Sequence, residues 1–233
     1  MLRDNAIFIV VAGAAIAACG GGGPEVQAGV GNGSLRVEAS VSASPVAGER
    51  AADAQGLRVE FAVDVFDAKG DPVPDAEVVF DSVLGPVTLG GGDCTRRYCG
   101  VQAGYAGSYG LSVARGGDFL DDVVFYGPAV HTVQAPVAGA EVDAGEPLAV
   151  RWAPAGAAER SHVESREFGE DLDGDPGAFE LPPEILRFRD DRPEDERVRV
   201  RREQSLDLTG GLPGSELTIS VRNGVEITTA PRP

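Results

Sequence analysis

Hydrophobic and polar residues alternate in two stretches of the first half of the chain, and this period of two predicts strands with one buried face. In the first stretch, the apolar residues that share one face are Leu35, Val37, Ala39 and Val41. Residues 57–65 show the pattern more clearly, because every odd position is apolar. A turn-rich stretch follows at residues 67–75, and we expect the next strand at residues 77–80.

Short apolar runs separated by turn residues continue to the end of the chain, whereas helical periodicity is hard to find. Further strands are predicted at residues 162–168, 197–202, 205–208, 216–221 and 225–229. Many short strands with turns between them are typical of a β-sandwich. The length of 233 residues suits one or two globular cores. We therefore expect an all-β fold with two immunoglobulin-like β-sandwich domains, at residues 34–127 and 128–233.

Two segments resemble known immunoglobulin-like domains. Residues 63–80 read VDVFDAKGDPVPDAEVVF, which resembles the strand–turn–strand of bacterial domains of the invasin and intimin kind. Sandwiches of the carboxypeptidase-regulatory and transthyretin types have a similar turn, so the exact topology stays open. Residues 139–152, GAEVDAGEPLAVRW, resemble the opening of immunoglobulin-like modules of cell-surface proteins. That resemblance implies that Trp152 lies in a core between two sheets.

The first eighteen residues have the pattern of an export signal. Arg3 precedes an apolar stretch at residues 6–18, which is too short to span a bilayer core of about 30 Å. The stretch ends Ile16-Ala17-Ala18-Cys19 and resembles the bacterial lipobox. The resemblance implies a lipoprotein signal peptide at residues 1–18, with cleavage before Cys19 and lipidation of its sulfur by palmitate-type chains. The alternative is an ordinary secretory peptide.

Residues after the cysteine show no hydrophobic periodicity. Residues 20–33 are rich in glycine, and such chains behave as flexible coils with a reach of roughly 20 Å over this length. We therefore expect a lipidated cysteine and flexible tether at residues 19–33. Gly20, in the position after the cysteine, favours the outer membrane over the inner one in the lipoprotein families that this segment resembles.

The net charge and the cysteines of the chain limit which partners and which disulfides are expected. The formal net charge of −17 disfavours nucleic acid, because it repels the phosphate backbone. Three cysteines are present, and with Cys19 lipidated, an oxidising compartment favours a disulfide between Cys94 and Cys99. Closing so short a loop would stabilise the fold by about 2 kcal/mol.

One acidic segment has the residue types of a cation site. Residues 170–177 read EDLDGDPG, and alternating carboxylates are the hard oxygen ligands that calcium favours. The predicted calcium ligands are Glu170, Asp171, Asp173 and Asp175. The segment departs from an EF-hand, because proline stands where that loop needs glycine. The alternative is a solvated acidic turn, with no cofactor bound.

Catalysis is not expected. The chain has two histidines and no G-x-S-x-G nucleophile elbow, and 6% aromatic residues provide few platforms for a sugar cleft. Arg197, Arg199 and Arg201 alternate with Val198 and Val200 and should share one strand face, either paired with acids on a neighbouring strand or forming a docking patch for an acidic glycan or partner. We therefore expect a non-enzymatic, membrane-anchored envelope lipoprotein acting in adhesion or protein–protein contact. The alternatives are a periplasm-facing accessory or scaffold subunit of an envelope machine and a carbohydrate-binding module, and the partner is an unknown protein or glycan.

Overall fold

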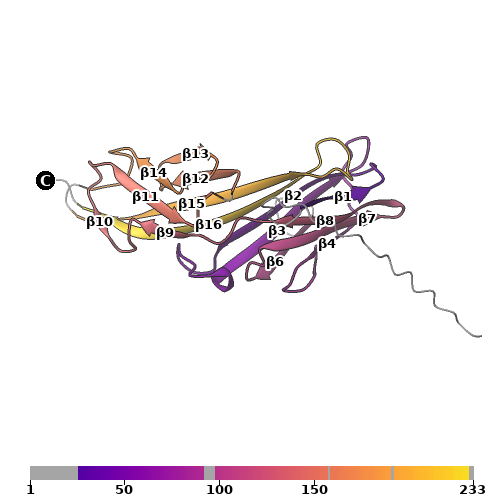
Figure 1. Cartoon of the computed structure of the whole chain (residues 1–233), viewed down its shortest axis with the longest axis horizontal. Helices are drawn as coiled ribbons and strands as arrows, with labels where there is room; N and C mark the ends of the chain where they lie inside the picture. Colours follow the sequence, from indigo (N-terminus) through magenta and orange to yellow (C-terminus); the bar gives the residue numbers. More distant parts are fainter. Residues whose placement is uncertain (1–25, 92–97, 157, 190–191, 231–233) are drawn as a thin grey trace, which may run out of the picture.

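The computed structural model describes residues 26–91, 98–156, 158–189 and 192–230, and they form an all-β protein (Figure 1). The strands of the first half are β1 (Gln27–Gly31), β2 (Arg36–Pro45), β3 (Leu57–Phe66), β4 (Glu77–Asp81), β5 (Val87–Thr88), β6 (Tyr98–Ala103), β7 (Ser108–Arg115) and β8 (Asp118–Tyr126). Those of the second half are β9 (Thr132–Ala135), β10 (Glu141–Val142), β11 (Leu148–Ala153), β12 (Arg160–Glu164), β13 (Gly169–Asp173), β14 (Ala178–Leu181), β15 (Glu194–Asp207) and β16 (Glu216–Thr229). Among the described residues, the one helical segment is the 3-10 turn η1 (Ala54–Gly56).

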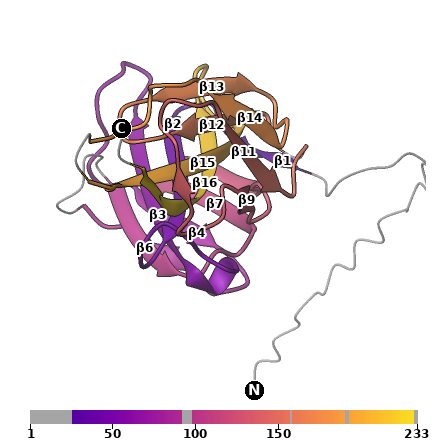
Figure 2. The ribbon, with the colours of Figure 1, turned by 90° about the vertical axis from the view of Figure 1, so that its left-hand side faces the viewer.

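The strands form three sheets. One sheet has the order β1-β8-β7-β4-β5, and a smaller one has the order β14-β11-β9. Both face a long eight-stranded sheet of order β13-β12-β15-β16-β2-β3-β6, in which β10 also pairs with β16 (Figures 1 and 2). Strand β16 pairs in parallel with β2 and β10, whereas the other pairings in the described strands are antiparallel.

Two hydrophobic cores fill the space between these sheets. The first core joins β2, β3, β4, β7 and β8, and it contains the stacked rings of Phe61 and Phe80, whose centroids are 4.6 Å apart. The second core surrounds Trp152 on β11. Facing sheets with a shared apolar interior define a β-sandwich, so the all-β fold class predicted from the sequence is confirmed.

The alternating stretches predicted as strands form β2 and β3. Their odd-numbered side chains from Val37 to Val41 and from Leu57 to Val65 are buried, and the intervening side chains are more exposed. The two strands pair antiparallel from Arg36 opposite Phe66 to Pro45 opposite Leu57. Because side chains in a strand point alternately to the two faces, the apolar set lies on the core side.

A long hairpin, β15–β16, links the two cores. Each strand has 14 residues, and they pair along their whole length, from Glu194 opposite Thr229 to Asp207 opposite Glu216. On β16, Leu217 and Ile219 pack in the first core, whereas Val225 and Ile227 pack in the second.

The hairpin changes two expectations from the sequence. The four strands expected between residues 197 and 229 are two continuous strands, because each has its partner beside it throughout and no turn interrupts the pairing. The expected boundary between residues 127 and 128 is also corrected in one respect. Residues 217–221 lie beyond it, yet they pair with β2 and complete the first core.

The glycine-rich tether predicted at residues 19–33 is corrected over its last part. Residues 27–31 form β1, which pairs with β8 from Gln27 opposite Val124 to Gly31 opposite Leu120. A Cβ atom at Gly31 would lie 2.2 Å from the carbonyl oxygen of Gly210. The glycine is therefore needed for close backbone approach rather than for flexibility.

The predicted signal peptide at residues 1–18 and the predicted lipidation site Cys19 lie outside the described residues. Within the part of the chain that the structure describes, no helix is long and apolar enough to span a membrane.

Candidate binding groove

A groove of about 670 Å³ lies on the second half of the molecule. Its walls are the loop at residues 47–50, which follows β2, and the turn at residues 138–139 between β9 and β10. Its floor is the outer face of the hairpin, around Arg197 on β15 and Glu226 on β16. We call this hollow the hairpin groove.

The alternation of β15 decides which side chains reach the groove. Glu196, Val198, Val200 and Arg202 point inward and are buried, whereas Arg197, Arg199 and Arg201 are on the outer face. The prediction that these last three arginines share one face is therefore confirmed. The position of Arg202 on the opposite face follows from the same period of two.

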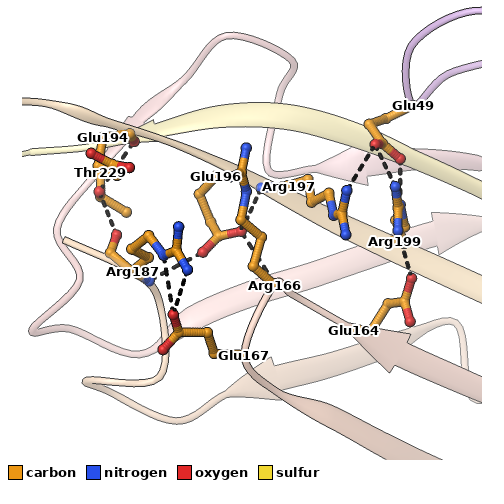
Figure 3. A network of polar contacts seen from close by, with 10 residues as sticks. All are labelled: Glu49, Glu164, Arg166, Glu167, Arg187, Glu194, Glu196, Arg197, Arg199 and Thr229. Atoms are coloured by element: carbon orange, nitrogen blue, oxygen red, sulfur yellow. Dashed lines mark hydrogen bonds and ion pairs between the residues drawn. The ribbon is translucent and has the colours of Figure 1, made fainter.

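Glu49, which lines the hairpin groove, binds Arg199 on the neighbouring part of β15 (Figure 3). Both guanidinium contacts of Arg199 Nε and Nη2 go to the Glu49 carboxylate, and the Nη2–Oε1 distance is 2.6 Å. Arg199 Nη1 also donates to Oε1 of Glu164 on β12 at 3.2 Å. Burial would raise the pKa of Glu49, but the hydrogen bonds and positive charge of Arg199 outweigh it and lower the pKa. A bidentate pair of this kind fixes the loop on the sheet.

Glu196 holds the floor of the groove in place. Its side chain is 0% exposed, and its carboxylate accepts hydrogen bonds from three backbone N–H groups, those of Arg166, Arg187 and Arg197, at 3.2, 3.1 and 2.7 Å (Figure 3). These donors belong to β15 and to two separate loops. A buried carboxylate requires such partners, so Glu196 ties both loops to the sheet.

Two exposed valines stand beside the groove. Val46 is 66% exposed and directly precedes the lining residue Ala47, and Val137 is 70% exposed and directly precedes the lining residue Ala138. The groove therefore combines a charged floor with apolar side chains on the loops that form its walls.

The described lining of the groove is rich in charged side chains. Arg50, Arg166 and Arg197 line it together with Glu49, Asp195 and Glu226. Arginines and carboxylates provide directional donors and acceptors for a partner.

The structure places three of the four predicted calcium ligands on a strand and the fourth, Asp175, beyond its end. Residues 169–173 form β13, so neighbouring acids point to opposite faces. Asp171 Oδ1 contacts Nδ1 of His162 at 2.7 Å, and Asp175 is buried elsewhere. Glu170, Asp171, Asp173 and Asp175 therefore do not converge. Among the described residues, no three His, Cys, Asp or Glu side chains are grouped to hold a metal ion, so calcium binding stays a prediction without a ligand cluster behind it.

Asp175 instead belongs to a buried ion pair that the sequence did not reveal. Its Oδ2 accepts from Arg202 Nε at 2.9 Å and Nη2 at 2.6 Å, and its Oδ1 accepts from Trp152 Nε1 at 2.7 Å. Both ion-pair side chains are 0% exposed. Trp152 lies in the second core, as predicted.

Two further polar residues lie buried where the cores meet. Asn223 Nδ2 donates to the carbonyl oxygens of Ala51 and His131, at 2.9 and 2.6 Å. His131 Nε2 contacts the carbonyl oxygen of Val200 at 3.0 Å. Burial, followed by the nearby positive charge of Arg202, lowers the pKa of His131 to about 4. His131 is therefore a neutral structural residue at ordinary pH.

The predicted disulfide has one described member. Cys99 lies on β6 opposite Ala62 of β3. Its predicted partner, Cys94, lies outside the described residues, so the disulfide stays a prediction.

Comparisons with known proteins do not assign the chain to a family. No family model matches the sequence, and no curated protein is similar to it. One similar solved structure is that of the Clostridium thermocellum CbhA fibronectin(III)-like modules, at 15% sequence identity and a TM-score of 0.28. The alignment covers 82% of this chain and 94% of that one.

Proposed function

We propose that this chain is a non-enzymatic binding module that docks a protein partner in the hairpin groove. The observation that carries the proposal is a groove of about 670 Å³ with a fixed charged floor, bounded by two loops whose lining residues directly follow the exposed Val46 and Val137. Protein interfaces combine apolar anchors with charged groups that set orientation and partner choice. Val46 and Val137 are the apolar contacts, and Arg197 and Glu226 are the charged ones.

Anchoring is the second part of the proposal. The lipobox-like segment supports export and lipidation at Cys19, with the outer membrane as the favoured location. Strand β1 lies at one end of the molecule, and β16 ends at the other (Figure 1). The groove is lined by Glu226 and Thr228 near that far end of β16. A membrane anchor before β1 would therefore leave the groove near the end of the molecule that lies farther from the anchor.

Photocrosslinking in the cells that make the protein tests the docking proposal. A photoreactive amino acid at Ala47, inside the groove, should crosslink to one reproducible protein. The matched control carries it at Val83, which is 83% exposed on the turn between β4 and β5 and should give no such product. The identity of the captured protein distinguishes adhesion to another surface from service as an accessory subunit. Equal products from both positions, or none from Ala47, would contradict docking in the groove.

Radioactive palmitate tests the anchor separately. The wild type should incorporate the label, and Cys19→Ser should not. Label retained by Cys19→Ser would remove the lipoprotein proposal without affecting the one about the groove.

A further inference from the structure

Strand β13 forms an open edge of the eight-stranded sheet. It is the end strand of that sheet, and among the described strands it pairs with β12 alone. In both views of the ribbon it lies along the margin of the second half (Figures 1 and 2). Two other sheet edges are covered. At the opposite end of the same sheet, Cys99 on β6 exchanges two backbone hydrogen bonds with Gly90, and at the edge of the five-stranded sheet β1 accepts one from the N–H of Thr209.

The register of β12 and β13 decides which backbone groups face the open edge. At one end of the pairing the carbonyl oxygen of Phe168 accepts a hydrogen bond from the β12 side at 2.9 Å, and at the other end the N–H of Gly174 donates one to that side at 2.9 Å. The register between these two points is continuous. Antiparallel pairs alternate between those that exchange hydrogen bonds and those that do not, so the even-numbered residues bond to β12. The N–H and C=O groups of Gly169, Asp171 and Asp173 therefore point away from the sheet.

The side chains of β13 favour a basic strand as the partner. Glu170 and Asp173 are exposed, and the Asp171 side chain is 81% exposed, with one oxygen in contact with His162. Arg160 on β12 lies opposite Asp173, so carboxylates outnumber guanidinium groups along this edge. Two copies of β13 would bring like charges together, which is destabilising. A strand with basic side chains instead meets opposite charge, and the net charge of −17 attracts it over a longer range.

Apolar side chains lie beside the open edge on the inner face. Leu172 on β13 packs against the second core and is half-buried. Phe168, directly before β13, stacks on Phe179 of β14 with ring centroids 6.3 Å apart, and both side chains are half-buried. Because β14 is itself the end strand of the small sheet, these side chains lie between two sheet edges. A strand added beside β13 would cover more of their apolar surface.

We propose that β13 binds an extended basic segment of a partner protein by β-strand addition. The segment pairs antiparallel to β13, which is the slightly more stable arrangement, and its backbone bonds to Gly169, Asp171 and Asp173. Its basic side chains lie on the outer face beside the two aspartates, and its apolar side chains lie on the inner face near Leu172. Main-chain hydrogen bonds give such a complex its affinity, and the alternate side chains give it specificity. No residue of β13 lines the hairpin groove, so the proposal goes beyond the one made for the groove.

Binding of a designed peptide to the full chain tests strand addition. The probe is a fluorescent peptide of sequence KVKVKVK, and fluorescence anisotropy should detect its binding. In an antiparallel pair, the residues on the face of Asp171 turn their own N–H groups toward β13, so these residues are the lysines. N-methylation of the backbone at the two central lysines keeps the charge but removes these donors, and it should weaken binding at least about tenfold. N-methylation at the two outer valines, whose N–H groups point away, is the matched control and should change binding less than about twofold.

Variants of the protein test the choice of a basic partner. Asp171→Asn combined with Asp173→Asn should weaken binding of the unmodified peptide about five- to tenfold, because each exposed ion pair contributes modestly. The matched control combines Glu77→Gln with Asp81→Asn, which removes two exposed charges from β4, an interior strand of the five-stranded sheet. It should change binding less than about twofold. Hydrogen exchange at the amides of Asp171 and Asp173 should slow when the peptide is bound, because these amides then donate to it.

Three outcomes would overturn the proposal. One is no binding of the peptide at millimolar concentration, and another is equal binding of the unmodified peptide and the one methylated at its lysines. The third is equal weakening by the two double variants, which would indicate net charge alone. Melting temperatures close to that of the wild type are the check on folding of both variants. Crosslinking from Ala47 reports the hairpin groove independently, so either proposal can fail alone.

Discussion

Replacing Asp175 with asparagine should destabilise the fold strongly. The variant leaves the Arg202 guanidinium with no counter-charge at a position where both side chains are 0% exposed. It also alters the acceptor of the Trp152 indole N–H, which lies 2.7 Å from Asp175 Oδ1. Removing one partner of a buried ion pair costs about 3–5 kcal/mol. For a chain of this size that corresponds to a melting temperature lower by about 6–20 °C.

The single tryptophan provides the assay. Trp152 is 2% exposed, so its fluorescence reports the loss of the second core during urea or thermal unfolding. The control is Asp75→Asn, which breaks the exposed pair of Asp75 with Arg115 at 2.8 Å and should cost about 0–1 kcal/mol. Adding Arg202→Met to Asp175→Asn should recover much of the loss, because no unpaired charge then remains. Equal losses for Asp175→Asn and Asp75→Asn would refute the reasoning.

Three further predictions concern other parts of the molecule. Gly31→Val should lower the free energy of unfolding by about 1–3 kcal/mol or more, because a Cβ atom there would lie 2.2 Å from the carbonyl oxygen of Gly210. The control in urea titrations is Gly117→Ala, since nothing lies within 4 Å of a Cβ atom at that position. His131 has a pKa lowered to about 4 from 6.5, so its unfolded form binds the proton first as pH falls. Stability should therefore fall between pH 6.5 and 4 by up to about 3 kcal/mol, and His131→Gln should flatten that dependence. Mass spectrometry of the non-reduced, exported protein should find Cys94 joined to Cys99, whereas free thiols would contradict that pairing.

The fold class could be predicted from the sequence because burial of one face makes apolar and polar residues alternate in strands such as β2 and β3. Leu57, Val59 and Phe61 must all reach one core, and the period of two makes this visible without a structure. The same period correctly placed three arginines of β15 on one face. The local pattern therefore predicts a strand and its buried face wherever one face of the strand contacts a core and the other contacts solvent.

The sequence failed where distant segments decide the role of a residue. Gly31 looked flexible because its close neighbour, Gly210, is far away in the chain. Asp175 looked like a calcium ligand because its partner Arg202 comes 27 positions later. The hairpin groove depends on Glu49 reaching Arg199 across 150 positions. No local pattern signals such pairings, although an arginine on the buried face of β15 could have indicated a buried acid.

The shared hairpin has a mechanical consequence. Strands β15 and β16 contribute side chains to both cores. If the strands of one half unfold, the core of the other half therefore also loses packed side chains. Independent tandem domains unfold one at a time under a pulling force. This protein should instead resist as one body and then yield in one large step. The described part of the chain should therefore behave as a stiff rod between its two ends.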